Sequence, residues 1–155
     1  MTSKGKSFEE KFRDDWKKSF PEGTIDRLYD NMSGYRHIST VCDFICYNYP
    51  YIWYMECKTH KGASLPLENI TQYEKLKMKD GIKGVRAGVV LWLYEKDKVF
   101  YIPISTITKM KEDGKKSVGI KAVEDGYNII EIPSKKLTVY MNSDYSILQS
   151  ENLVL

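Results

Sequence analysis

The chain has few cysteines, no long apolar run and little excess charge, and each of these features excludes a class of protein. Three cysteines in 155 residues are too few for a disulfide framework and indicate reduced thiols. No apolar run approaches the roughly 20 residues of a membrane span, and the N-terminus lacks a signal-peptide core. A soluble cytoplasmic protein with no membrane partner is therefore expected.

The glycine-rich phosphate-binding loops of P-loop and dinucleotide-binding proteins are also missing, so no nucleotide cofactor is indicated. What is present is a globular composition, with 42% apolar and 29% charged residues. A chain of 155 residues is long enough for one domain with its own core and short for two. The sequence predicts a single domain over residues 1–155.

The net charge of +3 permits a nucleic-acid surface without requiring one. The basic excess lies in the middle of the chain, at Lys75, Lys77, Lys79, Lys83 and Arg86. This cluster is either a solvated helix face or a phosphate-binding patch. His37 lies in a polar stretch without a catalytic partner at a suitable spacing, which favours a surface or phosphate-contacting role.

The N-terminal segment has the pattern of an amphipathic helix. Ser7 followed by Glu10 forms a capping box that marks the helix start, and Pro21 ends it. One apolar stripe recurs every four residues: Phe8, Phe12, Trp16 and Phe20. Glu9 lies beside this stripe, either directed inward at its edge or favoured in the first turn by the helix dipole.

The stretch Val41–Lys58 reads as two strands joined by a turn at Tyr49-Pro50. If the turn is symmetric, residues whose numbers sum to 99 face each other, and Asp43 lies opposite Glu56 with Cβ atoms about 5 Å apart. Two carboxylates at this distance repel each other and lose hydration unless a cation lies between them. Mg²⁺ suits such a site because it takes few carboxylates and completes its shell with water and phosphate.

Lys58 projects on the same side as Glu56 and could orient a nucleophilic water there. A salt-bridged strand pair is the alternative explanation of the same pattern. A zinc site that includes Cys42 and Cys46 is excluded if the strand forms, because these residues would lie about 13 Å apart along it.

The remaining pattern alternates helices and strands. Pro66 begins a helix that runs to about Lys79, and the continuous apolar run Val85–Tyr94 predicts a buried strand of the parallel kind. Further elements are expected as strands at Val99–Ile102, Tyr127–Ile132 and Leu137–Met141, and as a helix at Ser105–Asp113. The order predicts an α/β fold with a central mixed sheet flanked by helices.

With this order of elements, the chain resembles the PD-(D/E)XK nucleases. Their core consists of a helix, a strand pair that carries D…ExK, a second helix and a buried strand, in that order. Within them it is most similar to the RecU-like Holliday junction resolvases, including short phage forms. The matching residues are Gly5, Phe8-Glu9, Asp43-Phe44, Glu56-Cys57-Lys58, Ser64-Leu65-Pro66-Leu67, Asn69-Ile70, Gln72 and Gly114-Lys115-Lys116-Ser117. The resemblance implies the restriction-endonuclease-like fold and a Mg²⁺-dependent endonuclease that resolves four-way junctions by paired nicks.

The resemblance also implies roles for single residues. Asp43 and Glu56 would bind Mg²⁺, or Mn²⁺ in its place, together with the Cys57 carbonyl. Lys58 would position the attacking water, with Gln72 and Glu9 supporting the site. DNA contacts are expected from Lys61, Ser64, Lys75, Lys115 and Lys116. Branched DNA and a second copy of the chain, as a homodimer, would be the partners, in the host cytoplasm if a phage encodes the protein.

The segment Asp30–Val41 departs from the family pattern. Longer members carry a protruding stalk here, whereas this chain has about a dozen residues. The short segment leaves open a restriction-type or flap-type endonuclease of the same fold. A non-catalytic DNA-binding module is a further alternative, which the costly carboxylate pair disfavours.

Overall fold

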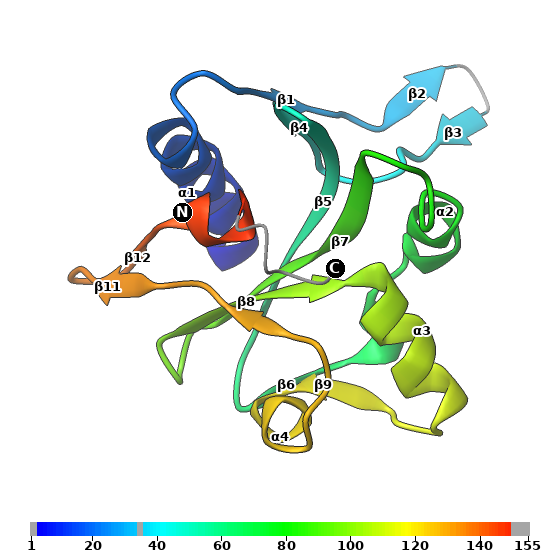
Figure 1. The fold of residues 1–155 in the computed structure, drawn as a ribbon, viewed down its shortest axis with the longest axis vertical. Coiled ribbons are helices and arrows are strands. Elements are labelled where there is room, and N and C mark those ends of the chain that lie inside the picture. The colour runs from blue at the N-terminus through cyan, green and yellow to red at the C-terminus, as the bar shows by residue number, and fades with distance from the viewer. Residues whose placement is uncertain (1–2, 34–35, 150–155) are drawn as a thin grey trace.

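A computed structural model describes residues 3–33 and 36–149 of the chain, with residues 31–33 and 36–38 described for their backbone only. Figure 1 shows a twisted central sheet with helices on both of its faces. Its six strands run in the order β1 (Thr24–Arg27), β4 (Phe44–Asn48), β5 (Tyr51–His60), β7 (Val85–Leu93), β8 (Lys98–Pro103) and β10 (Ile130–Glu131). Strands β5 and β7 are parallel and the other neighbours are antiparallel. The predicted α/β fold with a mixed sheet is confirmed.

Helix α1 (Lys4–Ser19) covers one face of the sheet. All four members of its aromatic stripe are buried, as the spacing predicted. The predicted start at Ser7 is wrong: the helix begins a turn earlier because the Ser3 hydroxyl accepts the amide of Lys6 at 3.2 Å and caps the end. Glu9 therefore lies in the second turn, so the helix dipole contributes little to its placement.

The hairpin of β4 and β5 has the predicted register. Phe44 pairs with Met55 and Cys46 with Trp53, so the paired numbers sum to 99. Their side chains join the α1 stripe in one aromatic-rich core. Strand β7 is buried along most of its length and pairs with β5 from Ile52 to His60, which confirms the predicted parallel central strand.

The opposite face is covered by η1 (Leu67–Asn69), α2 (Tyr73–Lys77), α3 (Ile104–Glu112) and α4 (Ile120–Glu124). The predicted helix from Pro66 to Lys79 is wrong, because Pro66 ends strand β6 (Ser64–Pro66) and only a 3-10 turn precedes the short α2. Strand β6 pairs with β9 (Ser117–Gly119), which the sequence pattern did not indicate. A Cβ at Gly119 would lie 2.1 Å from the carbonyl oxygen of Ala63, so this crossing requires glycine.

Two further small hairpins lie outside the main sheet. The polar segment after β1 forms β2 (Asn31–Ser33) and β3 (Arg36–Ile38) instead of the expected loop, and Figure 1 shows this hairpin projecting away from the sheet. The expected late strand Leu137–Met141 is also wrong. Residues 137–140 connect β11 (Ser134–Lys136) to β12 (Met141–Ser143), and the turn η2 (Tyr145–Gln149) follows.

The C-terminal hairpin is tied to the first helix by a buried carboxylate. Asp15 accepts hydrogen bonds from the Lys11 ammonium at 2.7 Å and from the Ser143 amide at 3.0 Å. This pair of contacts explains why a charged residue lies among the aromatics of α1. Within residues 3–33 and 36–149, no helix has the length and apolar content that crossing a membrane needs.

Candidate active site

Asp43 and Glu56 lie together at the start of β4 and the middle of β5. The amide of Asp43 donates to the Met55 carbonyl at 3.2 Å, and Asp43 Oδ2 accepts the amide of Cys57 at 2.8 Å. The side chains of Asp43 and Glu56 are also hydrogen bonded to each other. The hairpin register therefore brings the two carboxyls together, as expected from the numbering.

Glu56 is buried, with 4% of its surface exposed. Burial, followed by the hydrogen bond and the negative charge of Asp43, raises the pKa of Glu56 to about 9, while Lys58 opposes this shift. The carboxyl is thus held protonated at neutral pH unless a cation offsets the charge of the pair. Such a pair is well suited to a divalent cation.

The protein itself offers few ligands for this cation. Among the described residues, no three His, Cys, Asp or Glu side chains are close enough together to hold a metal. Two carboxylates and main-chain oxygen fit Mg²⁺, which keeps several waters and takes further oxygens from phosphate. They do not fit zinc, which needs three or four nitrogen and sulfur ligands.

Arg27 on β1 links the carboxylates of α1 and β4. Its Nη2 lies 3.0 Å from Glu9 Oε2, and its Nη1 lies 3.5 Å from Asp43 Oδ1. Burial and the nearby Asp43 raise the pKa of Glu9, whereas Arg27 and Lys58 lower it. Glu9 therefore belongs to the same electrostatic cluster as the carboxylate pair and Lys58, which selects the inward alternative for this residue.

The sequence analysis missed Arg27. A usable signal existed, because Arg27 stands two residues after the buried Ile25 on a strand, and such residues share a face. Hydrogen bonds to the main chain also fix the position of the Arg27 side chain, because its Nη1 donates to the carbonyls of Leu28 and Asp43.

Gln72 and Lys75 lie on the α2 side of the molecule. Gln72 is the half-buried N-cap of α2, and it makes no hydrogen bond with Asp43 or Glu56 in the described structure. The Lys75 ammonium donates to the carbonyl of Ser39 at 2.8 Å and to the Ser39 hydroxyl. Lys75 thus anchors the chain just before β4, and its expected DNA contact stays a prediction.

The other residues expected to contact DNA lie further along the chain from Lys58. Pairing of β6 with β9 places Ser64 beside the loop that carries Lys115 and Lys116. Lys61 is exposed in the turn between β5 and β6. The fold therefore joins segments that are about 50 residues apart into one polar surface.

The three cysteines are free and buried. Burial, and then the charge of Glu56, raises the pKa of the Cys42 thiol to about 12. Burial also raises the pKa of Cys46 and Cys57 well above the ordinary value. These thiols are poor nucleophiles and poor metal ligands, and the Cys57 side chain packs in the core while its amide faces Asp43.

Comparison with known proteins agrees with this arrangement. The profile of the family described as recombination protein U, RecU, matches residues 17–143. The solved structure of Hjc from Archaeoglobus fulgidus, a Holliday junction resolvase, matches with a TM-score of 0.57 and 18% sequence identity. That match covers 79% of this chain and 94% of Hjc. A comparison with curated protein sequences returns no match. The restriction-endonuclease-like fold that the family resemblance implies is confirmed.

Proposed function

The chain belongs to the RecU family of Holliday junction resolvases and is accordingly an endonuclease, and we propose that it cuts four-way DNA junctions by paired, metal-assisted nicks. The observation that carries this proposal is the buried carboxyl of Glu56 next to the partly buried carboxylate of Asp43, with Lys58 opposing the raised pKa of Glu56. A buried carboxyl beside a second carboxyl is costly to a fold, so its presence in a strand of the central sheet calls for a function.

Asp43 and Glu56 are the proposed Mg²⁺ ligands, with the Cys57 carbonyl as the main-chain ligand and Mn²⁺ as a substitute ion. When bound, the ion supplies a hydroxide-like water at neutral pH and stabilises charge on the leaving oxygen. The Cys57 amide holds Asp43 Oδ2 in place, so one oxygen of this carboxylate is fixed by the main chain.

Lys58 is the proposed positioning group for the attacking water. The positive charge of Lys58 lowers the pKa of both Glu56 and Glu9, which supports this role. Glu9 is the helix-borne acid of the site, held by Arg27. Gln72 would support the site from α2 when DNA is bound.

The proposed substrate is branched DNA, contacted by Lys61, Ser64, Lys75, Lys115 and Lys116. A homodimer would place two such centres on opposed strands of a junction, each chain acting as one nuclease domain. The proposed place of action is the cytoplasm, which is that of the host cell if a phage encodes the protein.

A panel of DNA substrates tests the choice of substrate. With Mg²⁺, the protein is expected to convert a synthetic four-way junction into two nicked duplexes, and chelation with EDTA is expected to stop the reaction. A linear duplex and a forked duplex of the same sequence are the matched controls. Equal cutting of all three substrates would contradict the proposal that the protein prefers four-way junctions.

The short β2–β3 hairpin favours one second candidate, a restriction-type or flap-type endonuclease. The segment between Asp30 and Val41 is a compact hairpin and not a long stalk. Preferred cutting of the forked or linear duplex would support this candidate. Absence of Mg²⁺ and Mn²⁺ binding in calorimetry would instead support a non-catalytic DNA-binding module.

A further inference from the structure

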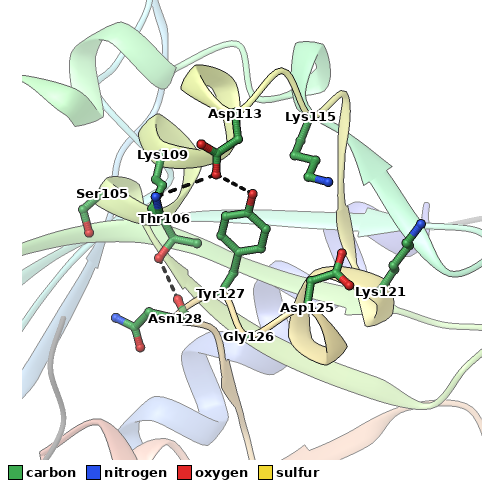
Figure 2. A pocket seen from close by; sticks show the side chains of 10 residues that line it. All are labelled: Ser105, Thr106, Lys109, Asp113, Lys115, Lys121, Asp125, Gly126, Tyr127 and Asn128. Atoms are coloured by element: carbon green, nitrogen blue, oxygen red, sulfur yellow. Dashed lines mark hydrogen bonds and ion pairs between the residues drawn. The ribbon is translucent and has the colours of Figure 1, made fainter.

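A groove of about 980 Å³ lies between α3 and the segment that contains α4. Figure 2 shows its lining: Lys109 comes from α3, Asp113 from the C-cap of that helix, Lys115 from the following loop, and Lys121 from α4. Tyr127 stands between the two sides. None of these residues belongs to the carboxylate centre, so the groove is a separate feature of the surface.

One of its two acidic residues, Asp113, is paired within the protein, whereas two of its three lysines form no ion pair in the described part of the chain. Asp113 Oδ2 accepts the Tyr127 hydroxyl at 2.6 Å and lies 3.8 Å from the Lys109 ammonium. Lys115 and Lys121 form no ion pair with any residue in the described part of the chain. Two ammonium groups without an ion pair among the described residues therefore border the groove, and Figure 2 shows both of them to the right of Tyr127, with Lys115 above Lys121.

The groove continues toward the surface expected to bind DNA. A neighbouring cavity of about 300 Å³ is lined by Ser64 and Lys116 and shares Lys115 and Lys121 with the groove. Together the two cavities form a track from the β6–β9 pair along α3. A nine-residue helix is about 13 Å long, and a DNA strand carries one phosphate per 3.4 Å of duplex axis. Because the backbone winds around that axis, successive phosphates of one strand lie farther apart than this rise, and the track is long enough for at least two of them.

We propose that this α3–α4 groove binds the phosphodiester backbone of one arm of the DNA, with Lys109, Lys115 and Lys121 as its contacts. The inference rests on the proposed function and deepens it, because it assigns Lys109 and Lys121 to the substrate. Lys109 already lies beside Asp113, so its charge contributes less than the charges of Lys115 and Lys121.

Binding measurements with Ca²⁺ in place of Mg²⁺ test the groove without cutting. The K109Q/K121Q double variant is expected to bind a fluorescent four-way junction roughly tenfold more weakly near physiological salt. The slope of log K against log salt should fall by about one for Lys121 and by a further, smaller amount for Lys109, whose charge is partly offset by Asp113. The matched control is Lys96→Gln, which removes one charge at an exposed turn between β7 and β8. Affinity and slope equal to those of the control would overturn the proposal.

A gain-of-binding variant removes misfolding as an explanation. Asp125 caps the C-terminal end of α4 and lines both cavities with a negative charge. Asp125→Asn is expected to tighten junction binding severalfold, because a phosphate in the groove no longer faces this carboxylate. Unchanged or weaker junction binding by this variant would contradict the proposal that the groove binds the DNA backbone.

The proposed function and the groove fail in different ways. If the wild-type protein binds junctions without cutting them, the function fails while the lysine variants still test the groove. If the lysine variants bind and cut DNA like the wild type, the proposed DNA binding by the groove is wrong, while the proposed nuclease function still stands. Acetylation of lysines in the wild-type protein gives an independent readout, since DNA should protect Lys121 and leave Lys96 reactive. Equal reactivity of Lys121 with and without DNA would overturn the proposal.

Discussion

The guanidinium of Arg27 lies 3.0 Å from the carboxylate of Glu9, joining the first strand of the sheet to the first helix at the mouth of the carboxylate centre. The same guanidinium lies 3.5 Å from Asp43. Arg27 thus provides positive charge at two of the three acids near the site in the metal-free protein.

Arg27→Met is expected to destabilise the metal-free protein by about 1–3 kcal/mol, because it leaves two partly buried carboxylates without their partner. Added Mg²⁺ should recover much of this loss, since a cation offsets the same repulsion. Urea unfolding with EDTA and with Mg²⁺ measures both values. Arg13→Met is the control, because Arg13 contacts the Phe44 ring and none of the acids. An equal loss of stability of Arg27→Met with EDTA and with Mg²⁺ would contradict the role of Arg27 in offsetting the charge of these carboxylates.

Glu56 makes the stability of the metal-free protein depend on pH. The pKa of Glu56 is raised from its ordinary value of 4.5 to about 9, so the folded state holds a proton that the unfolded state releases. The stability that the protonated Glu56 carboxyl contributes to the folded state is complete below about pH 4.5 and is lost as the pH rises toward 9. Urea unfolding in EDTA should therefore show lower stability at pH 8.5 than at pH 5.5.

Glu56→Gln is the matched variant for this pH dependence. Glutamine stays uncharged, so the decline between pH 5.5 and 8.5 should be much smaller than in the wild type. Mg²⁺ should stabilise the wild type at pH 8.5 and have little effect on the variant. A decline of the same size in both proteins would show that other groups cause it.

Gly119 controls the crossing that brings Ser64 to the lysine loop. A methyl group there would lie 2.1 Å from the Ala63 carbonyl oxygen and 2.7 Å from the Ser64 Cα, so β6 and β9 must separate. Gly119→Ala is expected to cost about 1–3 kcal/mol of stability and to weaken DNA binding. Thermal unfolding and a DNA-binding titration measure these effects.

Gly5→Ala is the control for this substitution. Gly5 lies in α1, and its added methyl group would meet only Thr59 Oγ1, at 4.0 Å. Alanine is the better helix former by up to about 1 kcal/mol. This variant should be as stable as the wild type or more stable. A large loss of stability in Gly5→Ala would show that the loss in Gly119→Ala is not specific to the β6–β9 crossing.

The sequence predicts the centre of this fold well because the signals there are local. The alternation on both sides of Tyr49-Pro50 defines the register that brings Asp43 and Glu56 together. The apolar run of β7 requires burial on both faces, which only a central strand provides. These elements carry Asp43 and Glu56, so the proximity of the two carboxyls was predictable from the same patterns, whereas their metal chemistry is implied by the family resemblance and stays a prediction.

Other parts depend on contacts between distant segments. The alternation of β1 places Arg27 on the same face as Ile25, but Arg27 meets Glu9 only because α1 packs against β1 and β5, and no local pattern encodes that packing. The pairing of β6 with β9 joins residues more than 50 positions apart. At Leu137 and Val139 the sequence alternates as in a half-buried strand, yet both side chains are exposed in a connection. Alternation predicts a strand only where a core exists to receive the apolar face.

The most direct test of the account is the single-turnover rate at which Glu56→Gln and Lys58→Met cut a saturating four-way junction in Mg²⁺. Both rates should fall at least about 100-fold, while junction affinity in Ca²⁺ stays within about threefold of the wild type. Glu22→Gln, at an exposed turn after α1, should cut like the wild type. Wild-type cutting by Glu56→Gln would contradict the assignment of the buried carboxylate pair as the catalytic centre.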